Sequence, residues 1–244
     1  PYILCTKEQL NDIEANCDKS KNYVLDADLA LQSYGGATFN LINLFSGTFN
    51  GRGHTLYNFS YNAPAVNNVG LFKLLDTGAK VEKLSLVNVN IIGKDDVGAI
   101  AGNTNNCASI SFVNVTGTVQ GALHVGGIVG TLKSCTLVRS ENRASVTGTF
   151  TGASQSVGGL VGYTSNATIS ESSNTGAVSS TLTGSGNRVG GITGQVDLNS
   201  RVKNSFNTGT VIASTSIENA YVGGAVGENL GIIEYAYSTG AVTS

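Results

Sequence analysis

Apolar residues recur along the chain in short alternating runs that are separated by Gly, Asn, Ser and Thr. One unit, Val-Gly followed by Gly or an apolar residue, begins at six positions at similar intervals. These are Val69, Val97, Val125, Val157, Val189 and Val222. Short alternation of this kind favours strands and leaves no room for helices of useful length. Six copies at intervals of about 28 to 33 residues therefore predict a repeat architecture.

Each repeat offers three strand candidates: the Val-Gly block, a small residue followed by an aliphatic one, and a block resembling Asn-Thr-Gly-x-Val. The small position is filled by Ala79, Cys107, Cys135, Ala167, Ser200 and Gly231. We expect it to point inward at a tight corner. The polar position is filled by Asn114, Asn142, Asn174, Asn207 and Ser238. Stacked amides at one position of successive coils predict a side-chain ladder.

The repeated glycines are structural candidates in this pattern. They are Gly98, Gly126, Gly127, Gly158, Gly159, Gly190, Gly191, Gly223 and Gly224. A recurring glycine indicates either a positive φ or a close approach of two backbones, and the pattern leaves both readings open. The 32 glycines of this 244-residue chain are thereby explained in large part by recurrence.

Three strands per coil, repeated in register, predict an all-β fold, a parallel β-helix of about seven coils in which each strand pairs with its equivalent about 4.8 Å away. Residues 1–60 differ from the repeats and are expected to form an N-terminal cap with the first coil or coils. They are continuous with the repeats at 61–244 as one domain. Thr6 and Gln9 have the spacing of a capping box, and Leu10, Ile13 and Cys17 share one face of the short capping helix expected up to Asn16.

The end of the chain, Val242-Thr243-Ser244, stops within the pattern, and no methionine is present. Solenoids need their terminal coils covered. We therefore expect either an end-to-end continuation with further repeats of a longer parent chain or a partner at this end.

Composition excludes several classes of function. Charged residues make up 12% of the chain and the net charge is −2, with no Lys/Arg run, so nucleic acid is not an expected partner. No stretch reaches the roughly 20 apolar residues of a membrane span, so membrane insertion is not expected either.

Few side chains suggest catalysis. His54 lies in a Gly-Arg-Gly-His-Thr turn and is expected to pack or cap, whereas His124 is expected to be exposed. The adjacent pair Asp95-Asp96 is interpreted as a solvated turn, although a β-helix polysaccharide-active enzyme could use carboxylates on one face. Glu141, Glu171 and Glu234 do not share a repeat position. We expect no catalytic residue, no cofactor and no metal site.

Four cysteines raise the question of disulfides. Cys5 and Cys17 flank the predicted helix, about 18 Å apart, which is too far to bridge. Cys107 and Cys135 are one coil apart and share the small position, so they should stack within about 5 Å. Parallel Cβ vectors are poor for a disulfide, and the sequence therefore favours two stacked, buried thiols.

The segment Val157-Gly-Gly-Leu-Val-Gly162 resembles the GLUG motif, and the copies at 125–130, 189–194 and 222–227 match nearly as well. The segments 2–10, 23–29 and 45–56 resemble the entry module that precedes such repeats, with Asn50 where the family usually has Asp. The resemblance implies a right-handed parallel β-helix in a large secreted or surface-anchored microbial protein, either a filamentous-haemagglutinin-like adhesin or the non-catalytic part of an immunoglobulin A peptidase. His54 and His124 do not stand in the His-Glu-x-x-His pattern of those zinc peptidases.

Three functional hypotheses follow. The first is a non-enzymatic adhesin module or stalk, secreted or at the cell surface, that serves cell adhesion and virulence by binding a host cell-surface protein or glycan. The second is a non-catalytic spacer or exosite region of a larger surface peptidase. The third is a β-helix polysaccharide-active enzyme.

Overall fold

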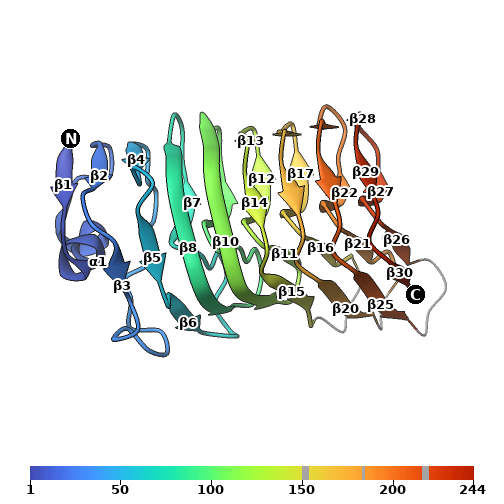
Figure 1. Cartoon of the computed structure of the whole chain (residues 1–244), viewed down its shortest axis with the longest axis horizontal. Helices are drawn as coiled ribbons and strands as arrows, with labels where there is room; N and C mark the ends of the chain where they lie inside the picture. The colour runs from blue at the N-terminus through green and yellow to red at the C-terminus, as the bar shows by residue number, and fades with distance from the viewer. Residues whose placement is uncertain (150–153, 183–184, 216–219) are drawn as a thin grey trace.

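A computed structural model describes the chain except for residues 150–153, 183–184 and 216–219. The described residues form a parallel β-solenoid of about seven turns, with one short helix at the N-terminal end (Figure 1). The coils follow one another along the long axis, so that residue number increases steadily from one end of the rod to the other. The expected fold class is confirmed.

The largest sheet has three strand positions in each coil. The first position holds β1 (Tyr2–Leu4), β2 (Tyr23–Leu25), β4 (Thr48–Asn50), the start of β8 (Lys80–Ile92), the start of β10 (Ser109–Gly121), β13 (Thr136–Val138), β18 (Thr168–Ser170), β23 (Arg201–Lys203) and β28 (Ile232–Glu234). The second holds β3 (Leu29–Ala30), β5 (Thr55–Tyr57), the middle of β8 and β10, β14 (Glu141–Asn142), β19 (Ser173–Asn174), β24 (Phe206–Asn207) and β29 (Tyr237–Ser238). The third holds β6 (Ser60–Asn62), the ends of β8 and β10, β15 (Ser145–Gly148), β20 (Val178–Leu182), β25 (Val211–Thr215) and β30 (Val242–Thr243).

Two smaller parallel sheets complete the coil. One contains β11 (His124–Gly126), β16 (Ser156–Gly158), β21 (Arg188–Gly190) and β26 (Tyr221–Gly223). The other contains β7 (Phe72–Leu75), β9 (Ala101–Thr104), β12 (Val129–Lys133), β17 (Val161–Ser165), β22 (Thr193–Val196) and β27 (Val226–Asn229). A full coil therefore has five strands where three were expected, because the Val-Gly-Gly block and the Asn block each contain a bend.

The register follows the repeat. Val125 pairs with Val157, which pairs with Val189, and these three side chains are fully buried. The bridges from Val69 to Val97 and from Val97 to Val125 extend the same column toward the N-terminus. The five unit starts from Val69 to Val189 therefore form one interior row of β-branched side chains, which suit a strand buried among its neighbours, and Val222 continues the row half-buried.

The repeated glycines allow backbones to approach closely. None of the nine predicted structural glycines has a positive φ. A Cβ on Gly158 would overlap the carbonyl oxygen of Val161, and a Cβ on Gly159 would overlap the side chain of Asn174. The first glycine of each pair thus lets the chain fold back tightly, and the second makes room for the polar ladder. Of the two readings left open by the sequence, close approach is correct.

That ladder is confirmed from Asn142 onward. Asn142 Nδ2 donates to Asn174 Oδ1 at 2.8 Å, and Asn174 Nδ2 donates to Asn207 Oδ1 at 2.8 Å. Asn207 Nδ2 continues to Ser238 Oγ at 3.2 Å, and each Asn Nδ2 also donates to the backbone carbonyl two residues ahead. The three asparagines are fully buried, so each of these three coils carries a satisfied polar group in its core.

Asn114 was wrongly assigned to this ladder. It pairs with Glu141 and is exposed, whereas Val115 occupies the ladder position beside Asn142. Val119 pairs with Val146 and Val115 with Asn142, so Asn114 lies one residue before the ladder position and, because side chains alternate along a strand, on the outer face. The register shift near Val115 and Gly117 concerns the preceding coil, since β8 contains one more residue than β10 there.

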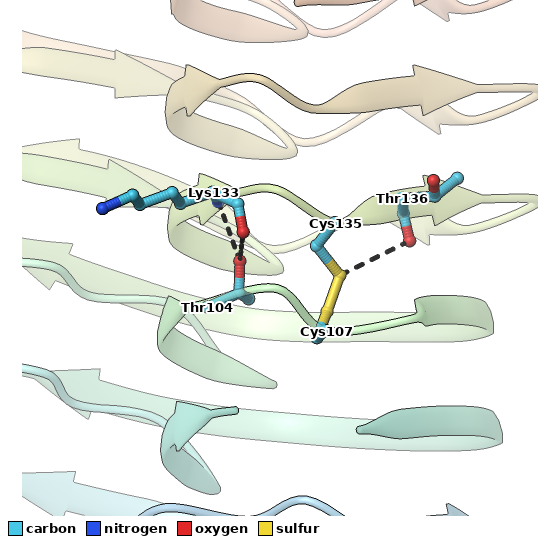
Figure 2. The surroundings of a disulfide bond; sticks show 5 residues. All are labelled: Thr104, Cys107, Lys133, Cys135 and Thr136. Atoms are coloured by element: carbon cyan, nitrogen blue, oxygen red, sulfur yellow. Dashed lines mark hydrogen bonds between the residues drawn. A yellow bond between two sulfur atoms is a disulfide. The ribbon is translucent and has the colours of Figure 1, made fainter. Parts of the chain in front are cut away.

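The small position lies inside the corner, as expected. Ala79, Cys107, Cys135, Ala167 and Ser200 are each no more than 5% exposed. The interpretation of Cys107 and Cys135 as stacked thiols is corrected, because the two residues are joined by a disulfide (Figure 2). Their Cα atoms are 4.9 Å apart, which lies within the bridging range, and at a corner the two side chains can turn toward each other. Next to the bridge, Lys133 N donates to Thr104 Oγ1 at 2.8 Å and links the same two coils.

Because the disulfide closes a loop of 28 residues, replacing Cys107 and Cys135 together by serine is expected to lower the free energy of unfolding by about 2 kcal/mol. Urea unfolding of the two proteins measures the difference. Thiol titration of the unfolded, unreduced wild type should find only the thiols of Cys5 and Cys17, which are free and exposed. Detection of all four thiols would contradict the bridge.

The helix α1 (Lys7–Asn16) covers the first coil. Thr6 and Gln9 form the predicted capping box, with Gln9 N donating to Thr6 Oγ1 and Thr6 N donating to Gln9 Oε1. Leu10 and Ile13 are fully buried against the core, whereas Cys17 is exposed and does not share their face. Within the described residues, no helix has the length and apolar content required to cross a membrane.

Candidate functional site

An outward corner runs along the rod between the first and second strand positions of the largest sheet. In six successive coils the residue at this corner has a left-handed conformation, with φ between 48° and 54°. We call these residues the left-handed ridge: Lys83, Phe112, Arg139, Glu171, Asn204 and Tyr235. Asn tolerates this conformation well, whereas Phe, Arg and Glu do so at a cost. The ridge therefore holds side chains in fixed outward positions.

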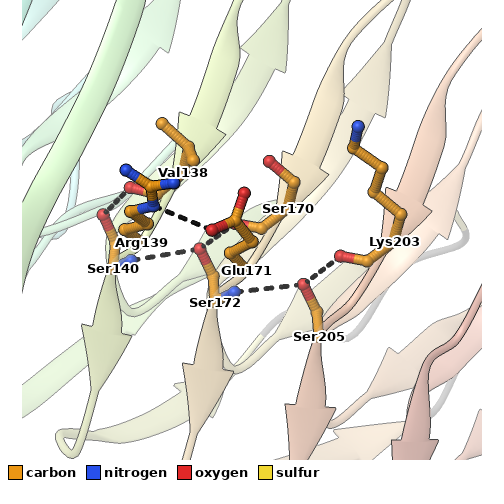
Figure 3. Close-up of polar contacts among 8 residues, drawn as sticks. All are labelled: Val138, Arg139, Ser140, Ser170, Glu171, Ser172, Lys203 and Ser205. Carbon is orange, nitrogen blue, oxygen red and sulfur yellow. Dashed lines mark hydrogen bonds and ion pairs between the residues drawn. The ribbon is translucent and has the colours of Figure 1, made fainter.

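A serine ladder lies beneath the ridge and stabilises the corner (Figure 3). Ser140 N donates to Ser172 Oγ at 3.1 Å, and Ser172 N donates to Ser205 Oγ at 3.2 Å. Each hydroxyl in turn donates to the carbonyl two residues earlier in its own coil. At the left-handed turn the hydroxyl thus accepts the hydrogen bond that a backbone carbonyl accepts elsewhere in the sheet.

Three ridge side chains interact along the axis of the rod. Arg139 Nε donates to Glu171 Oε2 at 2.8 Å, as Figure 3 shows. The guanidinium of Arg139 also lies over the Phe112 ring, 5.6 Å from its centroid. Phe112 remains 46% exposed. The result is an aromatic and cationic surface whose side chains are already held in place.

A second polar cluster lies where the sheets of β11 and β12 meet. Asp96 Oδ1 is 2.8 Å from His124 Nδ1 and 2.5 Å from Thr131 Oγ1. The His124 ring stacks on Tyr163, whose hydroxyl donates to Asp197 Oδ2 at 2.8 Å. The expectations of an exposed His124 and a solvated Asp96 are therefore wrong, since both side chains are nearly four-fifths buried.

The chemistry of this cluster is not that of a catalytic triad. A triad needs a hydroxyl on one ring nitrogen and a carboxylate on the other. Here Thr131 Oγ1 lies 3.2 Å from Nδ1, the nitrogen that Asp96 already contacts. The arrangement orients the imidazole and links successive coils, and it activates no nucleophile.

The other candidate residues are dispersed. His54 Nδ1 is 3.1 Å from Asp28 Oδ1, in agreement with its predicted capping role. The backbone N–H of Thr55, and then His54, hold the pKa of Asp28 below its usual value. The glutamates predicted to occupy different repeat positions do so. Glu171 is on the ridge, whereas Glu234 lies in β28, opposite Lys203 of β23 in the strand register.

Across the described ranges, no group of three His, Cys, Asp or Glu side chains is arranged to hold a metal ion. The serine ladder and the exposed Phe112 were missed at the level of sequence. A signal for the first was present, since Ser-x-Asn recurs at 140–142, 172–174 and 205–207.

Two family models match parts of this chain. Residues 7–117 match the M26 IgA1-specific metallo-endopeptidase N-terminal region, and residues 153–179 match the GLUG motif. The chain is therefore similar to the N-terminal region of M26 peptidases over residues 7–117 and to GLUG repeats further along. In the matched family this N-terminal region is separate from the catalytic domain.

Several curated proteins are similar to the chain. It is 30% identical to the immunoglobulin A1 protease of Streptococcus pneumoniae serotype 4 over 61% of its length, and 35% identical to halomucin of Haloquadratum walsbyi over 59%. It spans only 6% and 2% of these relatives. A crystal structure assigned as an immunoglobulin A1 protease from Bacteroides ovatus superposes with a TM-score of 0.81 at 22% identity, over 100% of this chain and 77% of that one. This structural superposition shows a shared fold.

Proposed function

We propose that this chain is a non-catalytic exosite of a secreted or surface-exposed microbial peptidase: a rigid rod that contacts the peptidase's protein substrate away from the scissile bond. The match of residues 7–117 to the M26 N-terminal region carries the proposal. Of the three hypotheses from the sequence, the relatives named as immunoglobulin A1 proteases favour this second one over an adhesin.

The geometry of the described residues agrees with this role. The polar side chains that the sequence singled out serve the packing of the rod, as in the asparagine ladder and the Asp96–His124 contact. The left-handed ridge, by contrast, presents large side chains to solvent. A spacer requires only a rigid rod, whereas an exosite also requires a contact surface, and the ridge provides one.

Binding without cleavage tests the proposal. The chain, immobilised through a C-terminal tag, is exposed to immunoglobulin A1 in a surface plasmon resonance experiment, with immunoglobulin G as the control ligand. We expect saturable binding of immunoglobulin A1, weaker or absent binding of immunoglobulin G, and intact heavy chains on a gel after incubation. Absence of immunoglobulin A1 binding would overturn the exosite role, and cleavage by the isolated chain would overturn the non-catalytic assignment.

A further inference from the structure

Phe112 is a residue type that neither folding nor packing favours at its position on the left-handed ridge. A phenylalanine with φ of +54° is strained, and the residue is 46% exposed, so that neither the backbone nor burial favours it there. Asn204, two coils from Arg139 on the same ridge, has a side chain that suits the conformation. An exposed aromatic at a strained position that Asn would fill without strain indicates a role outside the folding of the chain.

The surroundings hold the Phe112 ring in a fixed position. Arg139 lies over the ring and is itself held by its hydrogen bond to Glu171. The backbone at this corner is fixed in turn, because Val113 N donates to Ser140 Oγ at 3.3 Å. Aromatic and Arg side chains dominate the binding energy of protein interfaces, and side chains that are already ordered lose little entropy on binding.

The charges beside Phe112 indicate which partner surface would be complementary to it. On the other side of Phe112 in the same column lies Lys83, which is exposed and makes no ion pair with any described residue. The ring is thus bordered by an unpaired ammonium group and by a guanidinium that shares its charge with Glu171. The complementary surface is an apolar pocket with carboxylates at its rim.

We propose that Lys83, Phe112 and Arg139 form the contact through which the rod binds the peptidase's protein substrate, with Phe112 inserted into an apolar pocket rimmed by acidic side chains. This inference rests on the proposed exosite function and assigns it to one part of the surface. It requires no movement of the backbone, because the ridge is built into the repeat.

The test uses the whole chain with immunoglobulin A1 as the probe. Phe112→Asn removes the ring and leaves a residue that fits the left-handed conformation, so the fold is retained. Leu44→Asn is the matched control: Leu44 has φ of +53° and is 52% exposed, but it lies beside β7, away from the ridge. Thermal melting of both variants verifies folding. Phe112→Asn should raise the dissociation constant roughly 30-fold, the scale of an interface hot spot, and Leu44→Asn should leave it unchanged.

The outcomes separate the two claims. The ridge is supported as the contact if Phe112→Asn loses affinity and Leu44→Asn does not, and if the affinity of wild type falls more steeply with salt than that of Lys83→Gln. If Phe112→Asn binds like wild type, or if both asparagine variants bind equally weakly, the ridge is not the contact, and the exosite role is unaffected. Absence of wild-type binding overturns the exosite role itself and the ridge with it.

Discussion

Replacing Asn174 by alanine is expected to lower the free energy of unfolding by about 4 kcal/mol. Asn174 is fully buried, accepts a hydrogen bond from Asn142, and donates to Asn207 and to the carbonyl of Gly176. Its removal takes one hydrogen bond each from Asn142 Nδ2, from Asn207 Oδ1 and from the carbonyl of Gly176 in a buried site. Each buried hydrogen bond that is left unmade costs about 1–3 kcal/mol. Urea unfolding monitored by circular dichroism measures the change.

Asn114→Ala is the control for this prediction. Asn114 belongs to the same block of the repeat in sequence, but it lies one residue before the ladder position and is exposed. We expect its replacement to change the free energy of unfolding by less than about 0.5 kcal/mol. Equal losses in the two variants would contradict the register described here, and with it the assignment of Val115 to the ladder position.

Replacing Gly159 by alanine is expected to cost about 3 kcal/mol, through overpacking. A Cβ at this position would overlap the side chain of Asn174 and the carbonyl oxygen of Gly191. Neither can yield easily, because the first is held in the ladder and the second belongs to the next coil. The change would therefore separate two coils and disturb the asparagine ladder together, which the same unfolding experiment detects.

Gly35→Ala provides the comparison for this variant. A Cβ on Gly35 would meet no atom within 4 Å, and its φ is not positive. Alanine there should be neutral or slightly stabilising, because it restricts the unfolded chain. If Gly159→Ala were as well tolerated as Gly35→Ala, the close approach of the coils at the glycine pair would be refuted.

Much of this fold was predictable from the sequence because one rule governs every coil. Equivalent residues stack, so the intervals between Val125, Val157 and Val189 predict the register directly. The glycine and asparagine positions also change together. In the coil of Asn174 the second glycine of the pair is Gly159. In the coil where Val115 fills the ladder position, the equivalent residue is Ala99. The glycine is needed only where an asparagine side chain occupies the space that the missing Cβ leaves.

The remaining features depend on single residues that depart from the repeat. Asn114 is five residues before Val119, whereas Asn142 is four before Val146, the partner of Val119, so Asn114 misses the ladder position. The direction of Cys107 and Cys135 at the corner is set by local geometry that spacing does not contain. The left-handed ridge was missed because it shares no residue type: Arg139, Glu171 and Asn204 are alike in φ alone. Function was the least predictable, since the residues that the repeat made conspicuous serve packing.

Kinetics of a full-length immunoglobulin A1 protease with a region similar to this chain test the central claim most directly. The region equivalent to residues 1–244 is deleted, and cleavage is followed both on intact immunoglobulin A1 and on a short peptide containing the scissile bond. A non-catalytic exosite predicts that the deletion raises KM for the intact protein at least tenfold, leaves kcat nearly unchanged, and has no effect on the peptide. An equal loss of kcat on both substrates would contradict the account, because it would place this region in the catalytic machinery.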